Sequence, residues 1–160
     1  MIITQLNEAD WQRSKLLRLR ALQDAPDAFG STYAEERLMT NAAWKERLSS
    51  ARSATFHVAE NEQDIGLVVS ADYDGENAAG LFAMWVDPAA RGGGAGDLLI
   101  EAVKQWAREN GHARLVLDVA DDNATAIALY ERHGFVPTGH TDTLPPPRTH
   151  IKEHRRDLIL

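Results

Sequence analysis

Residues 86–96 read Val86-Asp87-Pro88-Ala89-Ala90-Arg91-Gly92-Gly93-Gly94-Ala95-Gly96, and this stretch is the most informative part of the chain. The pattern is typical of the end of a strand, a glycine-rich turn and the start of a helix. Glycines let the backbone turn tightly and point successive N–H groups into one concavity. The helix that follows adds its own unpaired N–H groups and the positive end of its dipole. With Arg91 at the rim, the stretch predicts a site for a di-anion such as a pyrophosphate.

Two common phosphate-binding patterns do not fit these glycines. The P-loop requires Lys-Ser or Lys-Thr at the end of the glycine run, and here Gly96 is followed by Asp97. The dinucleotide fingerprint requires a third Gly or Ala, but that position falls on Asp97 or on Leu99. The pattern Arg-x-x-Gly-x-Gly does fit, from Arg91 through Gly94 to Gly96, and it resembles the acetyl-CoA signature of the GCN5-related N-acetyltransferases (GNAT). A glycine turn between a strand and a helix can also be purely structural.

A second block of sequence carries the same resemblance. Residues 123–135 read Asn-Ala-Thr-Ala-Ile-Ala-Leu-Tyr-Glu-Arg-His-Gly-Phe. They resemble the later motif of the family, Asn-x-x-Ala-x-x-Leu-Tyr-x-x-x-Gly-Phe, at every fixed position. The distance between the two blocks suits an intervening helix and strand. The blocks and their connecting segment cover residues 81–135, about a third of the chain.

Composition limits the classes of function that need to be considered. A chain of 160 residues predicts one domain, and the absence of cysteine excludes disulfides and a thiolate nucleophile. The start Met1-Ile2-Ile3-Thr4 lacks the basic and apolar regions of a secretory signal, and no apolar run approaches membrane length. We therefore expect a cytoplasmic protein with no membrane partner. The net charge of −7 argues against a nucleic-acid partner held through its phosphates.

Hydrophobic periodicity and turn residues divide the chain into alternating elements. Strands are predicted over residues 1–6, 55–60, 65–71, 79–86, 114–119, 135–141 and 150–160. Helices are predicted over residues 10–23, where Asp10 is the expected cap, and over 32–38, 41–48, 94–109 and 122–133. Residues 24–31 and 72–77 are expected to be turns, and the prolines of 144–147 a loop, because proline supplies no ladder N–H group. This order predicts a mixed α/β single domain over residues 1–160. The family resemblance implies a central, mixed, mostly antiparallel, splayed β-sheet flanked by helices on both faces.

The resemblance also implies where acetyl-CoA, the expected cosubstrate, would lie. The strand edge beside acetyl-CoA would be formed by Met84, Trp85 and Val86. The N–H group of Met84 would donate to the oxyanion, and groups at Val86 would pair with the pantetheine amides. Asn123 would bond the pantetheine arm or an ordered water, or would simply cap the helix that follows it. No metal is expected. The pyrophosphate would lie at the turn formed by Arg91, Gly92, Gly93, Gly94, Ala95 and Gly96.

Direct transfer to an amine requires particular chemical groups. A primary amine with a pKa of about 10.4 is mostly protonated at neutral pH, so the reaction needs a base or a water path, an oxyanion donor and an acid for the thiolate. The resemblance places Tyr130 beside the CoA thiol as that acid. The alternative is that Tyr130 packs between helix and sheet as a core residue.

Asp118 is the candidate base, because a carboxylate within an apolar strand is costly to bury without a partner. Members resembling the ribosomal-protein alanine acetyltransferases have Glu at this place, twelve residues before the Tyr. The shorter Asp favours relay through an ordered water over direct proton abstraction. A salt bridge from Asp118 to Arg114 or to another basic side chain is an equal alternative.

These observations predict an acetyl-CoA-dependent N-acetyltransferase that acts on a small or peptide primary amine. Alternatives are an N-terminal or protein acetyltransferase, or a non-catalytic acyl-CoA-binding module, which would not need Tyr130 and Asp118. A homodimer is a possible assembly. The acceptor side would be bounded by residues 24–33 and 140–150. Acidic side chains there favour a cationic amine: Asp24, Asp27, Glu35, Glu36 and Asp142.

Overall fold

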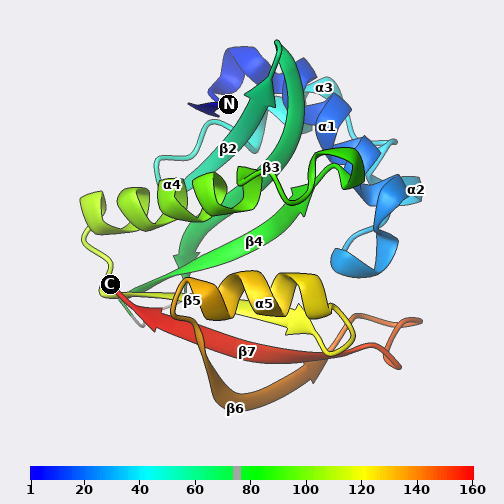
Figure 1. The fold of residues 1–160 in the computed structure, drawn as a ribbon. Helices are drawn as coiled ribbons and strands as arrows, with labels where there is room; N and C mark the ends of the chain where they lie inside the picture. The colour runs from blue at the N-terminus through cyan, green and yellow to red at the C-terminus, as the bar shows by residue number, and fades with distance from the viewer. Residues whose placement is uncertain (74–76) are drawn as a thin grey trace.

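The computed structural model describes residues 1–73 and 77–160, and within these residues seven strands form one sheet in the order β1-β2-β3-β4-β5-β7-β6 (Figure 1). The strands are β1 (Ile2–Gln5), β2 (Ser53–Glu60), β3 (Gln63–Tyr73), β4 (Ala78–Val86), β5 (Arg114–Ala120), β6 (Val136–Thr143) and β7 (Lys152–Ile159). Neighbouring strands are antiparallel except β4 and β5, which run parallel. The expected mixed, mostly antiparallel sheet is therefore confirmed.

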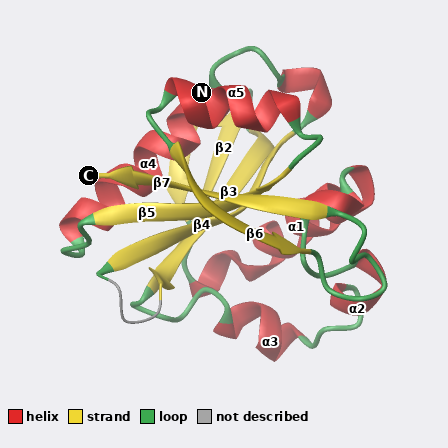
Figure 2. Cartoon of the chain, turned by 90° about the horizontal axis from the view of Figure 1, so that it is seen from below, coloured by secondary structure: helices red, strands yellow, loops and turns green. Residues whose placement is uncertain are grey.

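Helices cover both faces of this sheet, as Figure 2 shows. One face carries α4 (Ala95–Glu109) and α5 (Ala124–Arg132), and the other carries α1 (Trp11–Asp24), α2 (Tyr33–Glu36) and α3 (Asn41–Glu46). Short 3-10 turns precede or follow them at η1 (Glu8–Asp10), η2 (Pro26–Ala28) and η3 (Pro88–Ala90). The described residues thus form three layers, with a helical layer on each side of the sheet.

Each face of the sheet has its own apolar core. On one side α4 buries residues spaced three or four apart, such as Leu99, Val103 and Trp106, against strands β2 to β5. On the other side α1 buries Leu17, Ala21 and Leu22 against Leu67 and Trp85. Because residues alternate along a strand, β3 supplies Val68 to the first core and Leu67 to the second.

The element ends lie within two residues of those predicted from the sequence, but two local expectations were wrong. Asp10 does not cap α1 with its side chain. Its carboxylate accepts instead from the N–H group of Asn7 at 2.8 Å, while Asn7 caps η1, which makes a reciprocal capping box. The turn expected at residues 72–77 begins later, because β3 continues to Tyr73, and residues 74–76 lie outside the described part of the chain.

Strands β4 and β5 separate after only three paired positions. Ala78 to Gly80 pair with Arg114 to Val116, whereas β5 pairs with β7 on its other side along its whole length. Strand β4 is also bulged, because its register with β3 skips Ala83 and Met84, and Ala83 has a φ of 56°. The two strands diverge as drawn in Figure 1, so the predicted splay is present.

A buried carboxylate joins the three N-terminal helices. Glu36 of α2 is only 2% exposed at its side chain and accepts two hydrogen bonds from Arg18 of α1, at 3.0 and 2.8 Å. Arg47, which follows α3, adds a third at 2.8 Å. Burial by itself would raise the pKa of Glu36, but the two arginines outweigh it and hold the pKa below its usual value.

We predict that Glu36→Gln lowers the free energy of unfolding by about 3–5 kcal/mol, because the half-buried Arg18 and the more exposed Arg47 lose their charged partner inside the helical layer. A carboxyl group whose folded pKa is lowered stabilises the protein above its unfolded pKa, and this contribution is lost as the pH falls through the folded pKa. The variant should therefore lose less stability than the natural chain between neutral and acidic pH. Urea denaturation at several pH values measures both effects. Glu35→Gln, at an exposed neighbouring residue, is the control and should leave the curves unchanged.

Candidate functional site

A cleft occupies the gap between the diverging strands. Its walls are residues 81–84 of β4, residues 116–120 of β5 and the side of α5 that carries Tyr130. On the opposite face of the sheet it reaches residues 27–30 after α1 and the loop between β6 and β7. The cleft therefore has walls from both faces of the sheet, at the place where the strands no longer pair.

The glycine-rich turn lies between β4 and α4, as predicted. Gly92 and Gly94 have φ values of 81° and 93°, which side chains other than glycine rarely adopt. No side chain caps α4 at Gly94, so its first N–H groups are free to bind an anion. Gly96 lets α4 approach α5, because a Cβ atom there would lie 2.9 Å from Cδ2 of Leu129. The Nε atom of Arg91 donates to the carbonyl oxygen of Val86 at 3.1 Å.

The edge of β4 presents its backbone to the cleft. Met84 is half-buried and lines the cleft, and neither Met84 nor Ala83 is in register with β3. Trp85 lies differently, since its indole is buried beneath α1 and donates to Asp24 at 2.9 Å. The side chain of Trp85 thus belongs to the core, and only its backbone belongs to this edge.

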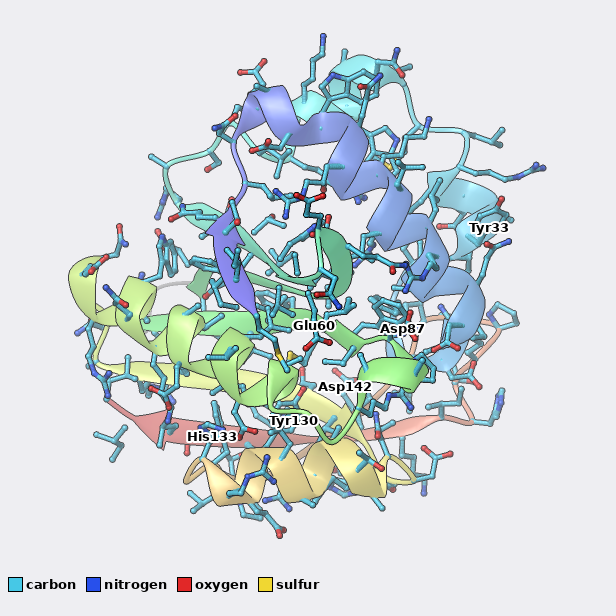
Figure 3. All side chains as sticks on the ribbon, turned by 45° about the horizontal axis from the view of Figure 1, so that its top comes forward. Tyr33, Glu60, Asp87, Tyr130, His133 and Asp142 are labelled. Atoms are coloured by element: carbon cyan, nitrogen blue, oxygen red, sulfur yellow. The ribbon has the colours of Figure 1, made fainter. Side chains whose placement is uncertain are left out.

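Tyr130 is almost fully buried where α5 faces α4, and Figure 3 labels it together with His133, which follows the last residue of α5. Its ring meets Phe135 edge-on, with centroids 5.8 Å apart. Burial raises the pKa of the Tyr130 hydroxyl, so this group is protonated at any ordinary pH. It makes no hydrogen bond to the rest of the described chain. The side chain therefore packs as a core residue and still brings a neutral, available hydroxyl to the wall of the cleft.

Asp118 is exposed and forms an ion pair across the sheet. Nε of Arg155 lies 3.1 Å from Oδ1 of Asp118, and Nη2 lies 3.4 Å from Oδ2. The two residues face each other in the β5–β7 register. The hydrogen bond to Asp118 raises the pKa of Arg155, which stays charged. Of the two roles left open by the sequence, the structure displays the salt bridge. Its partner is not Arg114, whose guanidinium lies 3.3 Å from Asp157.

Asn123 caps α5. Its Oδ1 atom accepts from the N–H group of Ala126 at 3.2 Å, so the capping role is present. Asn123 also lines the cleft, which leaves its amide nitrogen near the space where a ligand would lie.

An arginine that sequence reasoning missed ties the two loops of the acceptor side together. Arg148, after the proline run, donates to the carbonyl oxygens of Pro26, Phe29 and Gly30 at 2.7, 2.9 and 3.2 Å. The side chain of Arg148 is 16% exposed, and its other neighbour is Asp27, at 4.0 Å. No sequence pattern predicts that a single arginine will hydrogen-bond to a segment more than a hundred residues away in the chain.

The acidic rim expected on the acceptor side is only partly present. Glu36 lies in the core with its two arginines. The carboxylate of Asp24 accepts a hydrogen bond from Trp85 and forms an ion pair with Arg91 at 3.7 Å. A glutamate that the sequence analysis did not single out lines the cleft instead. Glu153 of β7 is half-buried, and its side chain makes no hydrogen bond or ion pair to other described residues.

Within residues 1–73 and 77–160, no group of three or more His, Cys, Asp or Glu side chains is placed to hold a metal ion. No helix in this part of the chain is both long and apolar enough to cross a membrane.

Comparisons with known proteins agree with this geometry. The model of the acetyltransferase (GNAT) family matches residues 18–135. N-acetyltransferase 8 of Homo sapiens is 34% identical over 97 residues, which are 58% of this chain and 43% of that protein. Mycothiol acetyltransferase of Amycolatopsis mediterranei is 38% identical over 63 residues, which are 39% of this chain and 21% of that protein. The chain thus spans less than half the length of these curated relatives.

Solved structures share the fold over nearly the whole chain. Ribosomal-protein-alanine N-acetyltransferase of Brucella melitensis has a TM-score of 0.80 at 21% identity and covers 100% of both chains. The protein yncA of Salmonella typhimurium, solved with its cofactor acetyl-CoA, has a TM-score of 0.78 at 21% identity. That comparison covers 99% of this chain and 93% of the Salmonella protein. Identities this low establish the fold alone.

Proposed function

The chain belongs to the acetyltransferase (GNAT) family, and from this premise we propose that it transfers the acetyl group of acetyl-CoA to a primary amine. The observation that carries the proposal is the cleft between β4 and β5. It has an anion-binding glycine turn nearby and an unbonded tyrosine hydroxyl on its wall. A glycine turn with a purely structural role would need neither free N–H groups for an anion nor a tyrosine hydroxyl without a hydrogen bond beside it.

The residues present fit acetyl-CoA. The uncapped first turn of α4, with Gly92 and Gly94 in the left-handed region, suits the pyrophosphate, and Arg91 adds a cation beside it. The free edge of β4 at Met84 and Val86 suits the amides of the pantetheine arm, because β5 does not pair there. When bound, acetyl-CoA supplies an activated thioester.

Two groups of this chain would then act on the thioester. The N–H group of Met84 would donate to the carbonyl oxygen as negative charge develops on it. Tyr130 would protonate the departing sulfur. The pKa of the buried phenol lies above that of a thiol. Tyr130 can therefore give its proton to the sulfur only if another proton replaces it on the phenol oxygen. The amine nitrogen must lose a proton as the amide forms, so it can restore the hydroxyl.

The acceptor would enter from the face of the sheet that carries α1 and α2. There, Arg148 holds the loop between β6 and β7 against residues 26–30, which narrows the way in. A narrow entrance favours a small amine or an extended peptide end over an amine on a folded surface.

Cofactor binding is tested by thermal unfolding. Acetyl-CoA at a hundredfold excess over its Kd should stabilise the chain by about 2.7 kcal/mol, and a rise in Tm of several degrees should follow. Pantetheine, which lacks the pyrophosphate, should raise the Tm much less. Arg91→Gln should reduce the shift with acetyl-CoA but not the shift with pantetheine. Equal stabilisation by the two compounds would refute the pyrophosphate site.

Catalysis is tested by Tyr130→Phe. The variant keeps the ring that packs on Phe135 and removes the proton donor, so kcat should fall by roughly 10²–10⁴-fold. Free-thiol release with a mixed amine panel measures this effect, and the Tm shift with acetyl-CoA should stay unchanged. A natural chain that binds acetyl-CoA but releases no thiol with any amine would be a binding module.

The narrow entrance is tested by Arg148→Ala. Loss of three hydrogen bonds from a charged donor should lower the Tm by several degrees and loosen both loops. Bulkier amines should gain in kcat/KM relative to the smallest ones. Arg37→Ala removes an arginine whose side chain makes no hydrogen bond within the described residues, and it should change neither property. An unchanged ranking of amines by size would show that the latch does not select the acceptor.

A further inference from the structure

Among the described residues, the charged side chains that line the cleft each have a partner of opposite charge, with one carboxylate as the exception. Asp118 is held by Arg155, and Arg18 is held by Glu36. Asp27 is 67% exposed at its side chain and lies 4.0 Å from Arg148. Glu153 has no such partner, although it is half-buried. An unpaired carboxylate that has lost part of its water is costly unless a ligand completes it.

Strand register places Glu153 on the acceptor side of the sheet. Glu153 stands opposite Ala120 of β5, just as Arg155 stands opposite Asp118. Directly opposed residues of antiparallel strands point to the same face, so Glu153 shares a face with Asp118. Leu117 and Val119 point the other way, into the core beneath α4 and α5.

Tyr130 belongs to that core, so it and Glu153 reach the cleft from opposite faces of the sheet. This arrangement suits direct transfer. A proton must leave the nitrogen on the acceptor side, and a proton must reach the sulfur on the cofactor side.

The charges around Glu153 make it a better base than an ordinary glutamate. Burial raises its pKa, Asp118 and Asp142 raise it further, and Arg148 opposes them. A carboxylate with a raised pKa accepts a proton more readily than an ordinary glutamate does. The same negative surroundings attract a cation. Other charged or titratable groups on the walls of the cleft or beside it are Arg18, Asp27, Tyr73, Tyr130 and Arg155.

We propose that Glu153 binds the ammonium group of the acceptor and takes its first proton, a role that rests on the proposed acetyl transfer. The freed electron pair of the nitrogen forms the C–N bond to the acetyl carbon, and the C–S bond breaks with its electrons on sulfur. Tyr130 protonates the sulfur and recovers a proton from the nitrogen. Glu153 then releases its proton to solvent, which leaves an amide and a free thiol. Asp118 holds Arg155 and is not the base.

The test is the pH dependence of kcat/KM, measured by thiol release between about pH 5 and 10. The probes are spermidine, 2-phenylethylamine, L-lysine methyl ester and a tripeptide with a free N-terminus, and the amine that the natural chain acetylates fastest is used throughout. Glu153→Gln should lower kcat/KM by roughly 10²-fold or more at neutral pH and recover toward high pH, where the amine is already neutral. Its KM for acetyl-CoA should not change.

Two further variants separate a chemical role from a structural one. Asp142→Asn removes a charge that raises the pKa of Glu153, so the acid limb of the profile should move to lower pH. Glu153→Asp keeps a carboxylate, so it should keep the acid limb of the pH profile while kcat/KM falls. This variant also tests the role of Glu153 if Glu153→Gln fails to fold. Glu46→Gln, at an exposed residue of α3, should match the natural chain.

Several results would overturn the inference. A Glu153→Gln variant with the rate and pH profile of the natural chain would contradict the role of Glu153. Thiol release by the natural chain would in that case still support acetyl transfer. An acid limb abolished by Asp118→Asn, but not by Glu153→Gln, would assign the base to Asp118. A natural chain that is not stabilised by acetyl-CoA and acetylates none of the amines would overturn both proposals.

Discussion

The separation of β4 from β5 is the constraint on which the rest of this structure depends. Parallel pairing stops at Gly80 because the bulge at Ala83 turns β4 aside, while β5 completes its hydrogen bonds with β7. A sheet that stayed paired would leave no opening between its faces. The unpaired length of β4 gives this fold a backbone edge inside its own core, where a ligand can replace the missing strand.

The first turn of α4 lies at the end of β4, so its free N–H groups are placed beside this opening. Glycines at positive φ permit the sharp reversal, and Gly96 allows the helix to lie close to α5. The uncapped N–H groups of α4 and the hydroxyl of Tyr130 on α5 are therefore held by the same packed layer. A shift of either helix would move both groups relative to β4.

Ion pairs decide which polar groups of the cleft remain available. Arg18 and Arg47 neutralise Glu36 inside the N-terminal layer, and Arg155 neutralises Asp118 on the sheet. These pairs fix the helices and strands that form the walls, but paired groups are poor candidates for chemistry that needs a free proton acceptor. Tyr130 and Glu153 line the cleft, and neither side chain has a hydrogen-bond or ion-pair partner in the described structure, so we assign proton transfer to them.

The elements, their order and the glycine turn could be predicted from the sequence, because helical and strand periodicities and the special φ values of glycine are local properties. Tyr130 was singled out by the resemblance of residues 123–135 to the later motif of the family. Tertiary structure alone decided the partner of Asp118, the burial of Glu36, the latch of Arg148 and the open position of Glu153. Asp118 and Arg155 are 37 residues apart, and Arg148 and Gly30 are 118 apart. Such contacts follow from strand order and register, which place β7 between β5 and β6, and no local pattern encodes that choice.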